Sequence, residues 1–483
     1  MRRQHLLKIL SYSAKNVWLL IFPLIRGLLS IKLGDAQAFL DWLKGAWFDI
    51  LTVVLIIFTG YIRWFFSYYI VKEDAIVLKN GVFIKTSKTI PIQKISSITE
   101  EHSFFLKPFK ATKLIINTCA GTLDNDLSIL VNYCDLHYIR RSLNSDDTDT
   151  LDENGNTNVT FYYKPKFWST FFFSFIFSST LSGAIYIFVF LFKTGSILEQ
   201  FFQRSVLDEF NMVTENVSQM LMLNVSPIFV SLSLIIAVSW LISFITNVIR
   251  YTNFKLKRKP DAVYIRTGVL TERFYKIVPN MVNYVDLCQS FITKLFRYVS
   301  INVNCSGYGS THKEIPVFIP IMSKKHCQQT ISAIMPNVKV NNSQYKPKIT
   351  TFWRYIYPAV FLCGGIALAY YISIYYFPTL TDLIKYIAIM SEIPSIWYLI
   401  VRIMALFTSG FSLKEGLLCI RYAKRFTFHT ILVAESNITK VCITQTIFQS
   451  FSDTYDITFY LNSEQSQLHR VKGLNRSAIE VFL

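Results

Sequence analysis

Residues 72–82 read KEDAIVLKNGV and residues 259–269 read KPDAVYIRTGV, so one pattern recurs 187 positions later. The same offset holds downstream without a gap, where Asn117 corresponds to Asn304. In both copies apolar and polar residues alternate, which is typical of half-buried strands, and a glycine marks a turn. A recurrence at fixed offset indicates a structural unit that is written more than once.

A third, more diverged copy lies near the end of the chain. Ile438 stands where the first two copies have Ile95 and Val282, but Lys424 falls where they have glycine. Each copy ends in a run of helical period. The sequence therefore predicts three antiparallel β domains, each with a C-terminal helix, at 68–145, 251–340 and 412–483.

Apolar stretches of about 20 residues, the length of a membrane-spanning helix, precede each β domain in pairs. Hydrophobic residues make up 52% of the 483-residue chain and charged residues 17%, against about 45–50% and 25% in soluble domains. This composition predicts a multi-pass membrane protein of α+β class and excludes a disordered or disulfide-stabilised protein. The six predicted transmembrane helices are 17–33, 47–66, 168–192, 225–249, 355–377 and 393–411.

The full predicted organisation alternates membrane and β segments. An acidic stretch rich in Gly and Asn is typical of a flexible linker. The motif Tyr-Lys-Pro-Lys occurs at 163–166 and again at 345–348, each time ahead of a predicted helix. Its lysines, Lys346 among them, are expected to anchor the end of that helix at the lipid headgroups. The segments are 1–67 with helices one and two, 68–145, the linker 146–166, 167–250 with helices three and four and an extracellular loop, 251–340, 341–411 with helices five and six, and 412–483.

The distribution of charge predicts the orientation in the membrane. Arg2, Arg3 and Lys8 lie at the N-terminus, whereas the loop 193–224 is net acidic, and positive charge in short loops marks the cytoplasmic side. We expect the N-terminus and all three β domains in the cytoplasm of a cell-membrane protein, with the loops near 34–46, 193–224 and 378–392 outside. The eight cysteines contain no CxxC pair, as expected of free thiols in a reducing compartment.

With these residues in view, the unit resembles the bacterial pleckstrin-homology-like (PH-like) domain of the YdbS/YdbT-type membrane proteins. The resemblance rests on the strand–glycine–strand at 75–84, the Ile/Pro-rich 89–95, the Ser-Phe stretch at 102–105 and the strand at 114–118. The second copy has Pro279 one position late, and the third lacks both glycine and proline. Six helices and three domains resemble the YdbT branch over essentially the whole chain. The resemblance implies a seven-stranded bent sheet capped by one helix in each domain, and no defined activity.

Motifs for chemistry are missing from the sequence. It contains no GxxxxGK[ST], no GxGxxG leading into a helix, no HExxH and no GxSxG. We therefore expect no enzyme activity, no cofactor and no bound metal.

The second β domain carries the strongest functional signal. Between Arg250 and Arg354 there are 17 Lys or Arg against four Asp or Glu, and each Lys or Arg near an anionic leaflet contributes about 1 kcal/mol of attraction. The residues expected to bind anionic lipid headgroups or a partner are Lys255, Lys257, Arg258, Lys259, Lys294, Arg297, Lys324 and Lys325. The alternative, a positive charge that only records the direction of membrane insertion, explains the residues beside the membrane but explains the last four, at 294, 297, 324 and 325, less well. Nucleic acid is not expected as a partner, because membrane tethering and the lack of a binding motif oppose it.

Two arginines lie within apolar stretches, namely Arg26 and Arg402. An ionisable residue inside the membrane is a candidate functional group, and the alternative is a long side chain that reaches the headgroups. The interpretation is a non-enzymatic scaffold that docks partner proteins or anionic headgroups at the inner leaflet. The alternative is a transporter or lipid-handling protein with Arg402 on its path.

Overall fold

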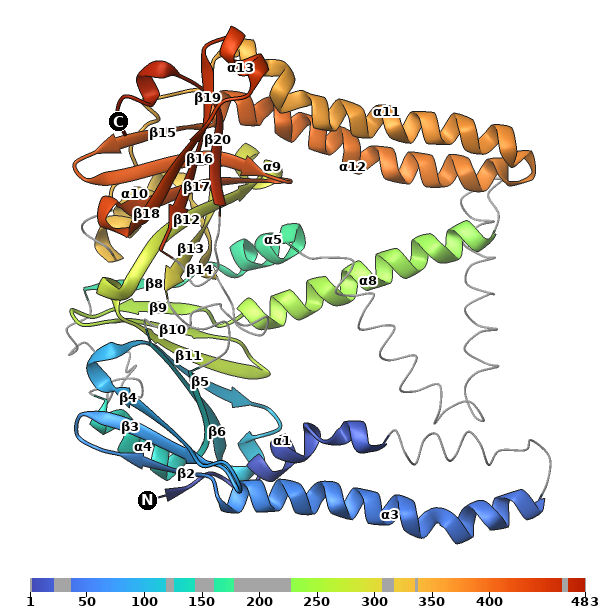
Figure 1. Ribbon diagram of the computed structural model, residues 1–483, viewed down its shortest axis with the longest axis vertical. Coiled ribbons are helices and arrows are strands. Elements are labelled where there is room, and N and C mark those ends of the chain that lie inside the picture. Colours follow the sequence, from blue (N-terminus) through green and yellow to red (C-terminus); the bar gives the residue numbers. More distant parts are fainter. Residues whose placement is uncertain are drawn as a thin grey trace.

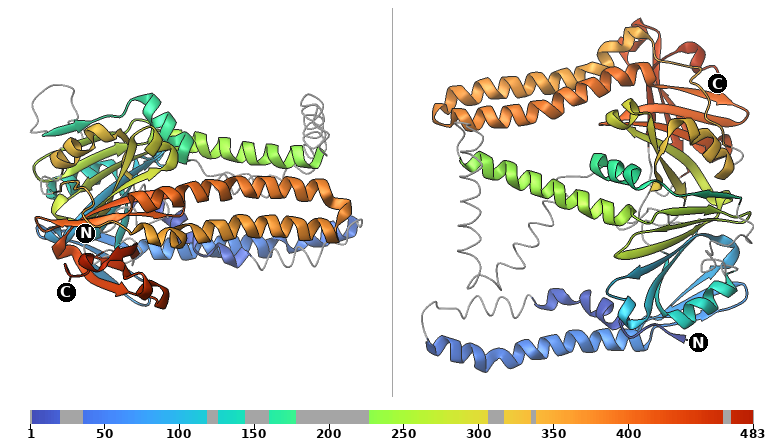
Figure 2. Two further views of the ribbon diagram at one scale, coloured as in Figure 1. Left: turned by 90° about the horizontal axis from the view of Figure 1, so that it is seen from above. Right: turned by 180° about the vertical axis from the view of Figure 1, so that it is seen from behind.

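The computed structural model describes residues 2–20, 36–118, 126–143, 160–177, 227–305, 317–334, 338–462 and 468–482. Within these residues, three β domains are stacked along the long axis of the molecule, and the long helices all extend to one side of the stack (Figures 1 and 2). This arrangement separates an apolar helical half from a half made of sheets.

Each β domain contains two groups of three antiparallel strands. The first domain has β2 (Tyr68–Val71), β3 (Ala75–Asn80), β4 (Thr86–Pro91), β5 (Ile95–Ser103), β6 (Ala111–Thr118), β7 (Leu127–Asn132) and the closing helix α4 (Tyr133–Ser142). The second has β9 (Lys255–Arg258), β10 (Val263–Thr267), β11 (Thr271–Ile277), β12 (Val282–Ser290), β13 (Tyr298–Cys305), β14 (Val317–Ser323) and α10 (Lys324–Ile334). The third has β15 (Gly410–Lys414), β16 (Leu417–Lys424), β17 (Thr427–Ala434), β18 (Ile438–Thr444), β19 (Thr454–Leu461) and β20 (Leu468–Asn475).

The alternation seen in the sequence produces the cores. In the first domain Ile76, Leu114 and Ile129 are buried between the two groups of strands. Gly81 and Gly268 both have positive φ, +122° and +95°, and an added Cβ would lie within 2.2 Å of a backbone oxygen at either site. The two glycines therefore form the same turn in successive repeats, as the 187-residue offset predicts.

The third domain differs from the expectation at its end. In place of a closing α-helix, the described residues after β20 form a 3-10 turn, Arg476–Ala478. Ala478 and Ile479 still pack on the core of the third domain. One turn is therefore enough to cover the site where α4 and α10 lie in the other two domains.

The segment that precedes each membrane stretch returns to the sheet that follows it. β1 (Arg2–Arg3) pairs with β2, and β8 (Phe161–Tyr163) pairs with β9. Tyr345 forms an isolated bridge with Phe411 at the same place in the third domain. Counting β1 and β8, the first and second domains each contain seven strands, the number that the resemblance implies.

The sheets also run from one domain into the next, which the sequence did not indicate. β5 of the first domain pairs with β11 of the second over seven residue pairs, 97–103 against 271–277. β12 of the second domain pairs with β17 of the third over seven more, 284–290 against 427–433. The three domains are therefore joined by backbone hydrogen bonds rather than by linkers alone.

Two helices in the described part are long and apolar enough to cross a membrane, over Ile349–Tyr376 and Ile387–Thr408. They form the side-by-side pair α11 (Phe352–Tyr376) and α12 (Thr381–Thr408) (Figure 1). Their surfaces carry exposed apolar side chains such as Phe361, which is 82% exposed. Contiguous apolar surface of this kind is a liability in water and is suited to lipid.

Three further helices have shorter apolar stretches, Ile50–Phe65, Phe167–Ile176 and Ile235–Tyr251. They belong to α3 (Ala36–Phe65), α5 (Phe167–Phe177) and α8 (Pro227–Tyr251). Most of the predicted span 17–33, much of 168–192, the start of 225–249 and the linker and loop at 146–159 and 193–224 lie outside the described residues. The arrangement of six spans in three pairs therefore stays a prediction.

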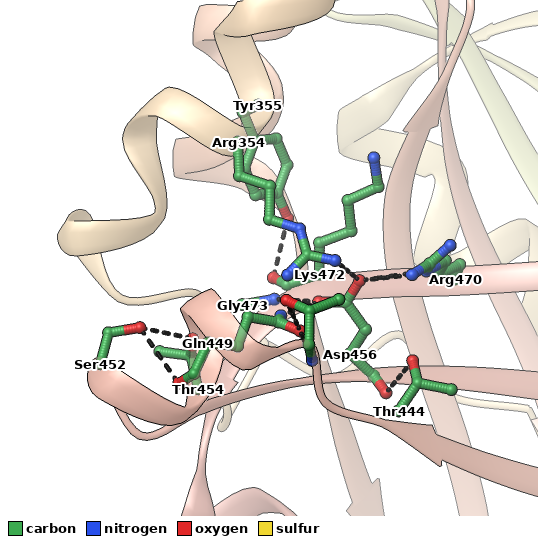
Figure 3. A network of polar contacts seen from close by, with 11 residues as sticks. Arg354, Tyr355, Thr444, Gln449, Ser452, Thr454, Asp456, Arg470, Lys472 and Gly473 are labelled. Atoms are coloured by element: carbon green, nitrogen blue, oxygen red, sulfur yellow. Dashed lines mark hydrogen bonds and ion pairs between the residues drawn. The ribbon is translucent and has the colours of Figure 1, made fainter.

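A buried carboxylate holds α11 against the third domain (Figure 3). Asp456 on β19 has no exposed surface and accepts hydrogen bonds from Arg354 at 2.8 Å and from Arg470 at 2.7 and 3.1 Å. Its other oxygen accepts from the Gln449 side chain at 2.7 Å and from the Gly473 backbone at 3.0 Å. Every acceptor site of the carboxylate is thus used, which is what allows a charge to be buried.

Candidate anion-binding site

The eight predicted basic residues fall into two groups. Lys255, Lys257 and Arg258 lie on β9 and Lys259 follows it. Two of this group lie over aromatic rings, Lys257 at 6.0 Å from the ring of Tyr162 and Lys259 at 5.5 Å from that of Tyr264. They form a row along one strand without a cavity.

The second group surrounds the start of helix α10. Lys294 lies on the short helix α9 (Phe291–Leu295), Arg297 follows it, and Lys324 and Lys325 begin α10. The backbone N–H of Lys324 donates to the carbonyl of Arg297 at 2.8 Å, which fixes the two segments together. The structure brings the half-buried Lys294 and the exposed Lys324 to the same cleft, whereas Arg297 and Lys325, also exposed, do not line it.

The cleft lies between the second and third domains and has a volume of about 460 Å³. Its walls come from α9, α10, β12, β16, β17, the segment 340–346 and the last residues of α12, Phe407 and Thr408. Four basic side chains line it: Lys294, Lys324, Lys346 and Arg421. No carboxylate lies among its described lining residues. The cleft thus borders the end of α12, one of the two helices that are long and apolar enough to cross a membrane.

Lys294 has one attractive contact, a cation–π contact with an aromatic ring, but its partial burial disfavours the charged form. Its ammonium nitrogen lies 3.6 Å from the centre of the Phe428 ring, and the side chain is half-buried. Burial lowers the pKa of Lys294 to about 8, and the positive charges of Lys324 and Arg421 add to this. Arg421 is fixed by donating to the carbonyl of Asn341 at 2.8 Å.

The equivalent cleft between the first and second domains contains a carboxylate that the cleft between the second and third domains lacks. It has a volume of about 280 Å³ and contains Lys107, the counterpart of Lys294 at the 187-residue offset. There Glu272 accepts a hydrogen bond from Lys107 at 2.7 Å and another from Arg266 at 3.0 Å. The basic groups of this first cleft are neutralised by a carboxylate of the protein itself.

Position by position, the second cleft has lost that carboxylate. Glu272 lies opposite His102 in the first joint, and Phe428 lies opposite the equivalent Gln289 in the second. Arg421 stands where Arg266 stands, since each pairs with the equivalent residue of the next strand. The same two cations are therefore present in both clefts, and in the second a phenyl ring replaces their acidic partner.

Two more acidic residues of the first joint are absent from the second. Glu100 is buried and paired with Arg140 at 2.5 and 2.9 Å, and Glu101 is paired with Arg273 at 3.1 Å. The offset places Leu287 and Cys288 at these two positions in the second domain. A cluster of cations without carboxylates, partly shielded from water, is a site for an anion that offers several acceptor oxygens, such as a phosphate.

Of the two arginines in the apolar stretches, Arg402 belongs to the part of the chain that the structure describes. The Arg402 guanidinium lies 4.7 Å from the centre of the Tyr398 ring and donates to the carbonyl of Ala423 at 3.4 Å. Because Ala423 belongs to β16, the arginine contacts the third β domain. Arg26 lies outside the described residues.

Sequence reasoning singled out Lys294 and Lys324 but missed Arg421 and gave Lys346 only an anchoring role. The offset between the second and third domains is 155 before the β16–β17 turn and 156 after it. This one-residue difference separates Arg421 from Arg266 in a gap-free comparison. Aligning the third copy with a gap at that turn would have found it.

The fold and the two joints define a membrane protein built from repeated PH-like domains. The chain belongs to the bacterial PH domain family, whose sequence model matches residues 27–146 and 215–336. It is similar to the UPF0699 transmembrane protein YdbT of Bacillus subtilis (strain 168), with 19% identity over 313 residues. The alignment covers 62% of this chain and 62% of that protein. No solved structure matches the chain. The resemblance to YdbT-type proteins is thereby confirmed.

Proposed function

We propose that this membrane protein binds phosphate groups of anionic lipids in the cleft between its second and third PH-like domains. In this proposal it is a non-enzymatic, multi-pass protein of the cell membrane, with its N-terminus and PH-like domains in the cytoplasm. Its lipid partners are those of the anionic inner leaflet, and nucleic acid is not a partner. The observation that carries the proposal is the replacement of Glu272 by Phe428 beside an otherwise retained pair of cations.

The physical argument is one of uncompensated charge. Like charges that are partly removed from water destabilise one another unless an opposite charge joins them. A lipid phosphate supplies that charge at the depth where α12 ends, and its acyl chains can stay in the bilayer beside Phe407, which is 67% exposed. Binding in the cleft therefore needs no extraction of the lipid.

The transporter alternative has less support. It relied on Arg402 lining a path between helices, and the guanidinium instead contacts the carbonyl of Ala423 in the third domain. A long arginine side chain can lie along apolar surface while its charged end reaches polar groups at the end of the helix.

The test uses the full-length protein in a neutral detergent and a short-chain phosphatidylglycerol, with phosphatidylcholine of equal chain length as the neutral probe. An isolated second domain is unsuitable, because β11 and β12 would each lose a paired strand. Calorimetry should show binding of the anionic lipid alone, weakening steeply with salt because the Debye length falls from about 10 Å at 0.1 M to about 3 Å at 1 M.

Two variants and a matched control test whether the anionic lipid binds in the cleft. Replacing both Lys294 and Lys324 with Gln should weaken the anionic lipid at least about tenfold, the effect of about 1.4 kcal/mol. Phe428→Glu should do the same by restoring an internal carboxylate. The control replaces Lys255 and Lys257 with Gln, which removes the same charge outside the cleft and should change binding little. Equal losses in the control, or equal binding of phosphatidylcholine, would contradict the proposal.

A further inference from the structure

The chain uses one kind of joint twice to connect its domains. In each joint the fourth of a domain's six main strands, β5 or β12, pairs antiparallel with the third of the next domain, β11 or β17. At the two ends of the row, one strand of each kind is left over: β4 in the first domain and β18 in the third. Both are the outermost strands of their sheets in the part of the chain that the structure describes.

These two strands are open where their counterparts are covered. Ser87, Lys88 and Thr89 of β4 are exposed, as are Thr439 and Lys440 of β18. The corresponding part of β5, residues 95–100, is buried beneath its joint with β11. An open strand edge presents unpaired N–H and C=O groups to any strand of matching shape.

β18 has the same local shape as the strands that already form joints. Each of the three follows a 3-10 turn, at Ile92–Lys94, Pro279–Met281 and Glu435–Asn437. Each also shows an irregularity in register at the equivalent place, between Ile95/Ser97, Val282/Tyr284 and Ile438/Lys440. A bulge bends and twists a strand, so β18 offers the curved edge that β5 and β12 offer.

We propose that β18 of one copy pairs antiparallel with β4 of a second copy of this chain. A second copy fits because the chain carries both halves of the joint, one at each end of its row of domains. Because the two halves differ, the contact is heterologous, and copies can add beyond a dimer into a ring or an open row. The existing joints keep the long helices on one side of the β domains (Figure 2), so the same joint between copies keeps all helices in one membrane.

The two joints within the chain fix the register of the one between chains. Thr99 lies opposite Tyr275 in the first joint, and Asp286 lies opposite Ile431 in the second. The residues at these repeat positions in β18 and β4 are Cys442 and Lys88. By the same rule Lys440 lies opposite Ile90, so no lysine directly opposes another.

Cys442 is a free, partly exposed thiol, which gives a direct test. Lys88→Cys in the full-length protein, in its native membrane, places a second thiol opposite it. Directly opposite Cβ atoms lie about 4.5–5.5 Å apart, within reach of a short bismaleimide. The expected result is a ladder of covalent dimers and larger species on a denaturing gel.

Two controls decide the meaning of the ladder. Ser87→Cys shifts the thiol by one residue onto the other face of β4, and Lys88→Cys combined with Cys442→Ser removes the native partner. Both should give no ladder, while eluting as folded protein in detergent. No ladder with Lys88→Cys alone, or an equal ladder in either control, overturns the proposal. Linkage of Cys442 to a different protein overturns it as well, by showing another occupant of the edge.

Discussion

Arg354, in the first turn of α11, donates to the fully buried carboxylate of Asp456 on β19 at 2.8 Å. The pair links α11 to the last β domain through the Asp456 carboxylate, which has no exposed surface. Arg470 on β20 shares the same carboxylate oxygen at 2.7 Å. One acidic residue therefore compensates two cations and holds together a helix and two strands.

Asp456→Ala should destabilise the third domain strongly. The two arginines left behind are partly exposed, but the buried Gln449 amide and Gly473 N–H lose their acceptor, which costs about 1–3 kcal/mol for each group. Thermal unfolding of the full-length protein in detergent should show the loss as a lower midpoint. Asp453→Asn is the matched control, since Asp453 is exposed directly before β19 and its loss should change the midpoint little. An unchanged midpoint for Asp456→Ala would mean that the network adds nothing.

Binding of the anionic lipid should depend on pH through Lys294. Burial lowers its pKa to about 8, so the side chain is mostly charged at pH 7 and mostly neutral at pH 9. Affinity should therefore fall as pH rises, by up to roughly tenfold between pH 7 and 9 from this group alone. Lys294→Arg keeps its charge over this range and should give a flat profile. A steep fall that persists in Lys294→Arg would assign the dependence to another group.

Acid should destabilise the third domain through His469. Burial lowers the pKa of His469 to about 4, with smaller contributions from the charges around it, and its Nδ1 lies 2.8 Å from the Tyr422 hydroxyl. Between about pH 6.5 and 4 the unfolded histidine binds a proton that the folded one does not. Stability is therefore full above pH 6.5 and falls below it, by up to about 3 kcal/mol.

His469→Gln removes this titration. Denaturant unfolding followed from pH 7 to 4 should show a shallower decline for His469→Gln than for the parent protein. His326→Gln is the comparison, because His326 is exposed at the start of α10 and should leave the slope unchanged. Identical slopes for the parent protein and His469→Gln would show that His469 does not cause the loss of stability in acid.

The orientation in the membrane can be read by cysteine labelling. Thr379 lies in the turn between α11 and α12, at the end of the pair away from the β domains, whereas Lys257 lies in the second domain. In intact cells an impermeant thiol reagent should label Thr379→Cys and leave Lys257→Cys unlabelled until the cells are opened. The reverse pattern would invert the proposed topology.

The repeat itself was readable from the sequence because its first two copies keep a gap-free offset. The alternation that buries Ile76 and Leu114 and the positive φ of Gly81 and Gly268 are local consequences of residue type. The pairing of β5 with β11 was not readable. Glu101 and Arg273 meet there across a joint whose two strands are far apart in the chain, and no turn or period records that contact.

The candidate site was predictable only where it depends on residues of a single domain. The excess of lysine marked the second domain, and Lys294 and Lys324 proved to share a cleft. Part of the cleft belongs to the third domain, however, and Arg421 enters only because β17 pairs with β12. Phe428, which contacts Lys294, is equivalent to Glu272 in the first joint. This equivalence could be recognised only once the structure showed that β11 and β17 take the same place in their joints.

The joint between the first two domains cannot form until both of its strands have been synthesised. β11 is made about 170 residues after the end of β5, which takes roughly 10–30 s at ordinary rates of translation. In the proposed topology, the edge of β5 stands open during that time, while the next apolar stretches are being inserted into the membrane. An open edge can pair with the same strand of another nascent chain. The yield of native protein should therefore follow the rate of membrane insertion, and slow insertion should favour aggregation of half-made chains.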